Sequence, residues 1–526
     1  MEVGVWLVGV MLRLLDLVLT PLYWLRPRDP RRLPPLDNPL LLRSAKDLAK
    51  SIRTGELTSE QVVEAFIERV KEVNPYLNAV VDERYGEALE EARVLDQRLQ
   101  EARSTGKMDE LLQNKPLYGL PFTVKASCSL AGLSNAVGCL ERAGSRAACD
   151  GHAVRAVRAA GAVPLLVTNT PELCLGWEST NLLHGTTNNP YRLDCTPGGS
   201  SGGEGALLAS GASIFSVSSD IAGSIRVPAA FCGLFGHKPT PGIIPIEGHI
   251  PTLTDEQYPK FLTVGPMCRH ADDLVLLTGV MAGDKAHLLK LDEPVDISKI
   301  RVHYMTEASN SLAFIPVERD IKDAIVDAAR YLQRDCGATI SEKKFKALED
   351  SVEMSISVFF SMKDMPNLLQ DPANPKRDKS LVVELIKSIL GCASRSLQGL
   401  GFALITRTRL FIPAARRTHY QLQAHALKEE ITSTLGSDGV LLYPAHCGVA
   451  HRHGRVFARA GGVAYSMPLN VLGLPAVVVP LANTRAPRDT SLPVALQVIA
   501  GPYQDRLCLA VAKQLEVGFG GWRPPP

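Results

Sequence analysis

Short apolar segments alternate with amphipathic helical segments from residue 119 to the carboxyl-terminal region, and this alternation limits the fold more than any other feature. The segments "LPFTVKAS" and "VPLLVTN" have the length and the β-branched content of strands, and "GHAVRAVRAAGA" between them has helical spacing. The pattern continues to "LPVALQVIAGP" near the carboxyl end. It predicts an α/β fold, in which helices cover both faces of one large mixed β-sheet.

Amphipathic helices are expected before this alternation begins. In "TSEQVVEAFIERVKEV", Thr58 and Gln61 form a capping-box pattern, which marks the start of a helix. Apolar residues then recur at helical spacing, with Val62, Phe66 and Val70 among them. A second helix is predicted over about residues 86–104.

The first 26 residues differ from the rest of the chain. From Val3 to Leu25 the sequence is almost wholly apolar and about as long as a bilayer core requires. Arg13 and Asp16 interrupt it, three positions apart, where they can pair on a helix. A cleaved signal peptide fits poorly, because the basic start and the small-residue cleavage site are missing. Residues 1–26 are therefore predicted to be a single-pass membrane anchor, with an interfacial hairpin or a helix lying in one leaflet as the alternatives.

A proline- and arginine-rich linker, residues 27–39, follows this segment. The stretch "RPRDPRRLPP" carries Arg26, Arg28, Arg31 and Arg32, and basic flanks tend to stay on the cytoplasmic side. The amino end would then lie on the other side of the membrane. The remaining residues, 40–526, are predicted to form one domain. The sequence leaves the organelle open, with the endoplasmic reticulum and lipid droplets as candidates.

A second apolar segment, residues 384–412, has two interpretations. It reads "ELIKSILGCASRSLQGLGFALITRTRLFI", and Lys387, Arg395, Arg407 and Arg409 interrupt it. One interpretation is a pair of helices that pack on the core. The other is a basic amphipathic cap that rests on a membrane and admits lipids.

Charge and cysteine content exclude several classes of protein. The formal net charge is only +2 and 21% of residues are charged, so the chain lacks the basic field that nucleic-acid binding requires. The 11 cysteines form no Cys-x-x-Cys pair. The histidines of "AHCGVAHRHGR", at positions 446, 451 and 453, lack the spacing of a zinc-protease motif. No metal and no other cofactor is expected.

Lys125 raises the first question about chemistry. It closes the strand-forming run of "GLPFTVKAS", where a charged side chain needs an explanation. On an edge strand the lysine would be solvated and of no catalytic interest. Burial would instead favour its neutral form, and only a neutral amine can act as a base.

Two serines stand within the glycine-rich stretch "PGGSSGGEGALLASGASIFSVSSDIAGSIRVPA", which begins at Pro197. A phosphate-binding loop would need a lysine after the glycines, and none follows. Two Gly-x-Ser-x-Gly matches, centred on Ser200 and Ser201, resemble the nucleophile elbow of α/β-hydrolases, for which the three histidines above are available. A purely structural glycine turn is the third interpretation.

The longer match decides among these three. From Gly198 to Ala229 the sequence closely resembles the amidase signature, and the resemblance extends from about residue 40 to the end, including "GPMCRHADDL" and "NVLGLPAVVVPL". The chain is identified as a member of the amidase signature family, and the spacing of the motif residues is similar to that of eukaryotic fatty-acid amide hydrolases. The resemblance implies the amidase-signature fold over residues 40–526. It also implies a catalytic triad of Lys125, Ser200 and Ser224.

The same resemblance assigns roles to the residues around this triad. Neutral Lys125 would accept a proton from Ser200, which would accept one from the nucleophile Ser224, leading to an acyl-enzyme. The backbone amides of Ile221, Ala222, Gly223 and Ser224 would stabilise the oxyanion, and Ser201, Asp220 and Arg226 would support the site. The peptide bond before Ser200 would be cis.

Three positions depart from the family pattern. The family usually has glycine where this chain has Ser218 and Ala222, and an acidic residue commonly follows the lysine where this chain has Ala126. If position 222 required a positive φ, the methyl group of Ala222 would strain the oxyanion loop by about 1 kcal/mol or more. A catalytically poor member is then conceivable.

The function predicted on this basis is a membrane-attached serine hydrolase that cleaves fatty acid amides, namely primary amides and N-acylethanolamines. One alternative is a lipid-binding pseudoenzyme with weak catalysis. Another is an amidotransferase A-type subunit, against which the apolar amino terminus argues. The expected partners are a fatty acid amide and membrane lipid but no nucleic acid, and a homodimer is left open.

Overall fold

The computed structural model describes residues 1–25, 29–371, 374–481 and 492–526. Arg26 and Arg28, and with them the predicted boundary between the apolar segment and the linker, lie outside the described residues. The helices are α1 (Val3–Leu25), α2 (Ala45–Thr54), α3 (Ser59–Leu77), α4 (Tyr85–Ser104), α5 (Met108–Leu112), α6 (His152–Ala159), α7 (Gly202–Ala209), α8 (Arg226–Phe231), α9 (Tyr258–Phe261), α10 (Ala271–Ala282), α11 (Arg319–Arg334), α12 (Ser351–Phe359), α13 (Leu381–Ile389), α14 (Leu397–Thr408), α15 (Ala414–Leu435), α16 (Met467–Val471) and α17 (Asp505–Phe519).

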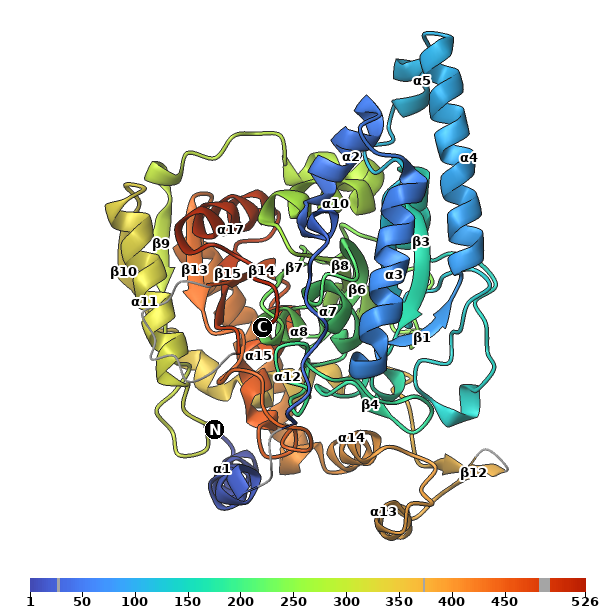
Figure 1. Ribbon diagram of the computed structural model, residues 1–526. Coiled ribbons are helices and arrows are strands. Elements are labelled where there is room, and N and C mark those ends of the chain that lie inside the picture. The colour runs from blue at the N-terminus through green and yellow to red at the C-terminus, as the bar shows by residue number, and fades with distance from the viewer. Residues whose placement is uncertain (26–28, 372–373, 482–491) are drawn as a thin grey trace.

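One mixed sheet runs through the molecule, as the alternation of strands and helices predicts (Figure 1). In the part of the chain that is described, this sheet has 11 strands in the order β1-β3-β2-β6-β8-β7-β14-β15-β13-β9-β10. These strands are β1 (Val80–Glu83), β2 (Pro121–Lys125), β3 (Val163–Thr168), β6 (Phe215–Asp220), β7 (Phe235–Lys238), β8 (Thr263–Cys268), β9 (Arg301–Tyr304), β10 (Thr339–Glu342), β13 (Gly439–Tyr443), β14 (Ala476–Pro480) and β15 (Ala495–Ala500). Two small hairpins pair β4 (Thr180–Asn181) with β5 (Gly185–Thr186) and β11 (Gln370–Asp371) with β12 (Asn374–Asp378).

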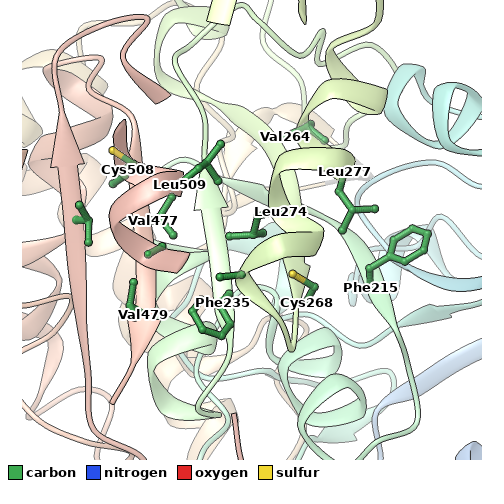
Figure 2. Packing of buried hydrophobic residues seen from close by; sticks show 14 of the residues in the cluster. Phe215, Phe235, Val264, Cys268, Leu274, Leu277, Val477, Val479, Cys508 and Leu509 are labelled. Atoms are coloured by element: carbon green, nitrogen blue, oxygen red, sulfur yellow. The ribbon is translucent and has the colours of Figure 1, made fainter. Parts of the chain in front are cut away.

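Both faces of the sheet are buried by helices. Figure 2 shows Val477 and Val479 of β14 on the side where α10 and α17 pack, close to Leu509 of α17. Val478 between them belongs to a second apolar cluster, which includes Ile225 and other residues of the α8 region. This alternation follows from the two-residue period of a strand, and it explains why β14 reads as a continuous apolar run.

Three neighbouring strands, β3, β2 and β6, run parallel and position the functional residues. The carboxyl ends of parallel strands meet at one edge of a sheet, so Thr168, Lys125 and Asp220 are brought to the same edge. The side chain of Val124 joins the apolar core, whereas Thr123 on the opposite face bonds to Glu204 of α7. The period of the strand places Lys125 on this second, polar face.

The predicted amino-terminal helices are present. The helix α3 begins after Thr58, and the capping box between Thr58 and Gln61 is formed in both directions. The second predicted helix corresponds to α4, and the strand predicted near the carboxyl end corresponds to β15. These elements follow from local sequence signals, and the structure confirms them.

The apolar segment forms α1, which is long and apolar enough to cross a membrane. The expected pairing of Arg13 with Asp16 is not found among the described residues. Asp16 instead pairs with Arg455 at 2.5 Å and with Arg459 at 3.1 Å, and Arg13 donates to the backbone carbonyl of Phe314 at 3.4 Å. The local spacing rule failed here because more favourable partners come from a distant part of the chain.

The start of α1 also contacts the rest of the protein. The amino group of Met1 lies 2.5 Å from Asp350, and Glu2 accepts from Arg416 at 3.0 Å and from Tyr420 at 2.6 Å. Many apolar side chains of α1 nevertheless face outward, Leu17 and Val18 among them. The helix therefore lies along the protein surface with an apolar side uncovered.

The segment 384–412 forms parts of two helices, α13 and α14. In Figure 1 these helices and α1 lie along one side of the molecule. On α13, Ile386 and Ile389 are among the exposed apolar residues, whereas Leu400 of α14 is buried. The α14 half thus packs on the protein, and the α13 half projects apolar side chains outward.

Candidate active site

Lys125 is fully buried at the carboxyl end of β2, an inner strand of the sheet. Its Nζ lies 2.7 Å from Ser200 Oγ, 3.0 Å from Ser219 Oγ and 3.3 Å from the backbone carbonyl oxygen of Ser219. A solvated lysine on an edge strand is therefore excluded. The amine is instead held among neutral hydrogen-bonding groups, directly against the first serine of the glycine cluster.

Ser200 and Ser201 are held just before α7 by close backbone packing. The peptide bond between Gly199 and Ser200 is cis, as the resemblance implies. A Cβ atom at Gly199 would lie 2.8 Å from the carbonyl oxygen of Gly176, so only glycine fits there. The amide of Ser201 donates to the carbonyl of Ser224 at 3.2 Å, and its hydroxyl donates to the carbonyl of Ser219 at 3.4 Å. Ser201 thus ties the glycine cluster to the second serine segment.

Ser224 lies at the same cavity as Ser200 and is 4% exposed. Within the described part of the chain, no hydrogen bond joins the hydroxyls of Ser200 and Ser224. The structure therefore forms the contact between Lys125 and Ser200 and places Ser224 beside them on the cavity wall. It does not form the second link of the predicted relay.

Asp220 and Arg226 form a fully buried ion pair that organises the turn carrying Ser224. Arg226 donates to Asp220 through Nε at 3.0 Å and Nη2 at 2.9 Å, and Asn470 donates to the same carboxylate at 3.1 Å. The amide of Ile225 also donates to Asp220, at 3.1 Å. Burial alone would raise the pKa of Asp220, but the Arg226 guanidinium outweighs it and holds this pKa well below its usual range. The pair is thus buried and structural, not a surface contact.

In the predicted oxyanion loop, residues 221–224, one backbone amide is engaged by Asp220 and three are not. The amide of Gly223 donates to Asp220 at 2.8 Å, whereas the amides of Ile221, Ala222 and Ser224 have no hydrogen-bond partner among the described residues. Gly223 has a φ of 101°, and a Cβ atom there would lie 2.6 Å from the Cβ of Ser466, so this position requires glycine. The predicted role of Gly223 as an oxyanion donor would require its amide to leave Asp220.

The departures from the family pattern are accommodated without strain. Ala222 is not among the described residues with positive φ, so the condition for strain at this position is not met. Its carbonyl accepts from the indole Nε1 of Trp177 at 3.1 Å. The hydroxyl of Ser218 lies 3.1 Å from that of Ser216 within β6, and Ala126 is buried beside Lys125 in the chain.

Ser219 contacts Lys125 directly and His249 contacts Ser219, and no role for either residue was predicted from the sequence. His249 Nε2 lies 2.9 Å from Ser219 Oγ, which in turn lies 3.0 Å from Lys125 Nζ. Burial, and secondarily Lys125, lowers the pKa of His249 to about 3. Ser219 stands inside the signature stretch, where it could have been suspected. His249 lies in the loop between β7 and β8, and no local pattern indicates that it returns to this site.

A buried carboxyl lies behind the triad. Glu204 of α7 accepts from Thr168 at 3.0 Å and from Thr123 in a shorter hydrogen bond. Burial raises the pKa of Glu204 to about 8, although these hydroxyls act in the opposite direction. The side chain is therefore mostly protonated at neutral pH.

An apolar cavity of about 230 Å³ opens at the serines. Its few polar groups, apart from the serines and Cys174, are His249, Tyr258, Trp177 and Gln398. The remaining wall is aliphatic and aromatic, and it includes Leu173, Leu175, Leu253, Phe359, Phe360, Met362, Phe402, Ile405 and Phe457. Such a wall fits an alkyl chain and leaves polar interactions to the end where the serines lie.

The three histidines that an α/β-hydrolase would need lie elsewhere. His446 and His451 pack edge-on against Phe231, and His453 lies 2.6 Å from Glu178. None of them contacts Ser200 or Ser224 among the described residues. This arrangement excludes the histidine-based triad.

The chain is similar in sequence to known amidases over most of its length. A family model described as amidase matches residues 61–509. Fatty-acid amide hydrolase 2-A of Danio rerio is 40% identical over 504 residues, which cover 94% of this chain and 92% of that protein. Fatty-acid amide hydrolase 2 of Homo sapiens is 38% identical, over 93% of this chain and 92% of that protein.

The fold comparison gives the same result. A solved structure of fatty acid amide hydrolase superposes with a TM-score of 0.73 at 21% identity, covering 98% of this chain and 95% of that chain. At this identity the match speaks for the fold alone. The family match over most of the chain and the two relatives show that the protein belongs to the amidase signature family and is an amide hydrolase.

Proposed function

We propose that this amide hydrolase is a membrane-attached serine enzyme that cleaves fatty acid amides through Lys125, Ser200 and Ser224. The observation that carries the proposal is the 2.7 Å contact between buried Lys125 and Ser200 at an apolar cavity whose wall includes Ser224. The amine is thereby held within hydrogen-bonding distance of the hydroxyl from which the proposed base would take a proton.

The proposed reaction begins when the neutral amine of Lys125 takes the proton of Ser200. Ser200 takes the proton of Ser224 as the Ser224 oxygen attacks the amide carbonyl. Since the two serine hydroxyls are not bonded in the structure, this step requires that they first come within hydrogen-bonding distance of each other. The C–N bond then breaks, the same relay returns the proton to the leaving amine, and water hydrolyses the acyl-enzyme to the fatty acid.

The free amides of the oxyanion loop are the proposed electrostatic stabilisers. Those of Ile221, Ala222 and Ser224 are available without rearrangement. The left-handed Gly223 shapes the loop, and its amide is held by Asp220. Loss of one such donor typically costs roughly 3 kcal/mol of transition-state stabilisation.

The apolar wall of the cavity is suited to a long acyl chain, and we infer that this chain is the part of the substrate that the enzyme recognises. The names of the relatives point to the same class, since both are fatty-acid amide hydrolases. We infer that primary amides and N-acylethanolamines of fatty acids are the substrates. Among the described residues, the few polar groups of the wall leave little to bind a charged amide such as glutamine, which argues against the amidotransferase alternative.

Membrane attachment is proposed to involve α1, α13 and α14 together. The three helices lie on one side of the molecule, and α1 and α13 expose apolar side chains there (Figure 1). Phe402 and Ile405 of α14 also line the cavity. A lipid substrate could therefore enter from the membrane without crossing water.

The decisive experiment compares Ser224→Ala with the unchanged protein on a panel of fatty amides that differ in chain length and head group. Ser224→Ala is expected to abolish hydrolysis and labelling by a fluorophosphonate probe. Lys125→Ala is expected to slow acylation by roughly 10²- to 10⁴-fold, the usual contribution of a general base. Robust turnover by Ser224→Ala would end the proposal, and an unlabelled, inactive wild-type protein would favour a pseudoenzyme.

A further inference from the structure

His249 ends a chain of hydrogen bonds that reaches the proposed base. Its ring is buried in the loop between β7 and β8 and forms part of the cavity wall. The chain runs from His249 Nε2 to Ser219 Oγ at 2.9 Å, from there to Lys125 Nζ at 3.0 Å, and on to Ser200 Oγ at 2.7 Å. Each atom in this chain has a limited number of protons to donate, so the direction of each hydrogen bond can be worked out.

The backbone fixes the tautomer of His249. Nδ1 of His249 lies 2.9 Å from the carbonyl oxygen of Pro251, and a carbonyl oxygen can only accept. Nδ1 must therefore carry the proton. The hydroxyl of Tyr258 donates to the same carbonyl at 2.9 Å, which holds the acceptor in place. In the neutral ring, Nε2 is then an acceptor, and Ser219 must donate its hydroxyl proton to it.

This direction determines what Lys125 can do. Because Ser219 Oγ donates its hydroxyl hydrogen to His249 Nε2, this oxygen can only accept from Lys125, and the carbonyl of Ser219 also only accepts. A neutral amine has two N–H groups and one lone pair, so both of its protons are used on Ser219. The lone pair then remains for Ser200, whose hydroxyl proton must point toward Lys125.

The charge on His249 is governed by its surroundings. Burial is the main cause that holds the pKa of His249 far below neutrality, and Lys125 adds to this effect whenever the amine is protonated. The other polar neighbours, Ser219, Tyr258 and the Pro251 carbonyl, are uncharged at neutral pH. The ring therefore stays neutral, and Nε2 stays an acceptor, over the range in which enzymes are assayed.

We propose that His249 is a positioning residue for the reaction: through Ser219 it orients the lone pair of Lys125 toward Ser200. This inference rests on the proposed function and adds Ser219 and His249 as residues that orient its base. His249 takes no proton from the substrate and does not contact the reacting atoms. Without it, the Ser219 hydroxyl can rotate and donate to the amine, which removes the lone pair from Ser200.

The test compares His249→Leu with His249→Gln on a fatty amide substrate. Leucine removes the acceptor, so kcat is expected to fall by roughly 10- to 100-fold with KM nearly unchanged, the range reported for partners that orient a reacting group indirectly. Glutamine offers an amide oxygen in the same region, and it is expected to restore most of the lost kcat. Fluorophosphonate labelling of Ser224 should follow the same order, because it depends on the same activation.

A double-mutant cycle with Ser219→Ala separates this role from a merely structural one. If His249 acts through Ser219, His249→Leu should have no further effect on kcat in the Ser219→Ala background. Ser129→Ala is the matched control, since it removes the hydroxyl that donates to the neighbouring Gly248 carbonyl at 2.6 Å but leaves Ser219 bonded to His249. It is expected to keep a kcat within about twofold of wild type, as for loss of a modest hydrogen bond outside the relay.

The outcomes separate failure of this inference from failure of the proposed function. Additive effects of His249→Leu and Ser219→Ala, or a kcat of His249→Leu equal to that of wild type, would overturn the role of His249 while leaving Ser224 and Lys125 essential. Full activity of Ser224→Ala would instead overturn the proposed function itself. Thermal melting of each variant identifies a variant that does not fold, in which case His249→Gln and Ser219→Ala carry the comparison.

Discussion

Glu204 is a carboxyl that is kept protonated by its surroundings. It is fully buried, it accepts from Thr168, and burial raises its pKa to about 8. In the unfolded chain a glutamate loses its proton near pH 4.3, so between about pH 4.3 and 8 the folded state binds more protons than the unfolded state. The free energy of unfolding should therefore fall as the pH rises through this window.

The variant Glu204→Gln is expected to lose this dependence. Between pH 5 and 8 the free energy of unfolding of this variant, relative to that of wild type, should increase with pH by at most about 1.4 kcal/mol per pH unit. The measurement is the difference in thermal midpoint between the two proteins, determined at pH 5, 6, 7 and 8. A difference that stays constant over this range would mean that Glu204 is already ionised in the folded protein.

Trp177 connects the cavity wall to the oxyanion loop. Its indole donates to the carbonyl of Ala222, which lies in the chain between the free amide of Ala222 and the engaged amide of Gly223. Trp177→Phe keeps an aromatic ring in the wall but removes this donor. Loss of about 1 kcal/mol of loop ordering corresponds to roughly a fivefold lower kcat.

Steady-state kinetics on a fatty amide checks this prediction. Phe360→Leu is the control, because Phe360 lines the cavity but has no hydrogen bond to the loop, and its effect should appear mainly in KM. If Trp177→Phe raised KM and left kcat unchanged, Trp177 would be a substrate contact and not a support of the loop.

Helices and strands could be predicted from the sequence where their formation depends on residues that are close together in the chain. Thr58 and Gln61 lie within one helical turn, so the start of α3 could be predicted from their identities alone. The strand β2 could be predicted from its β-branched and aromatic residues. Its position inside the sheet could not, because strand order depends on contacts between distant segments.

The same limit applies to the site. Lys125, Ser200 and Ser224 could be named because they belong to a recognisable motif. His249 could not, since its role depends on a loop that returns to the carboxyl ends of β2 and β6. The pairing of Asp16 was predicted with Arg13, three residues away, but the structure pairs it with Arg455 and Arg459 from the other end of the chain.

The proposed membrane attachment can be tested by substitutions on helix α13. Ile386 and Ile389 are exposed on it, 52% and 84% respectively. A double variant with glutamate at both positions is expected to bind phosphatidylcholine vesicles at least 10-fold more weakly, since each exposed isoleucine offers up to about 1.5 kcal/mol of burial. Its kcat on a short, water-soluble amide should stay near that of wild type.

Val517→Glu is the matched control for this experiment. Val517 lies on α17, is 72% exposed, and is far from α13 in the fold (Figure 1). It should leave vesicle binding unchanged, as measured by co-sedimentation. Equal loss of binding in both proteins would point to a general effect of charge and not to a membrane-facing side.

For the whole molecule, the contacts of α1 bear on its orientation in the membrane. Met1 contacts Asp350 at the start of the helix, and Asp16 contacts Arg455 and Arg459 in its second half. A helix that crossed the bilayer would have to break these contacts. It would also take Arg13 and Asp16 into the hydrocarbon core, at roughly 2.5–3.5 kcal/mol for each central charge. If the protein is membrane-attached as proposed, the contacts favour α1 lying along the membrane surface, beside α13 and α14.

Protease protection in sealed microsomes tests this orientation. An epitope placed before Met1 is expected to be digested together with an epitope placed after Pro526, because an in-plane α1 keeps both ends on one side. Replacing Arg13 and Asp16 by leucine removes both the link to the protein and the cost of insertion, so this variant should show a larger protected fraction of the amino-terminal epitope. If the unchanged protein protected that epitope until detergent was added, α1 would be a single-pass anchor, as the sequence alone predicts.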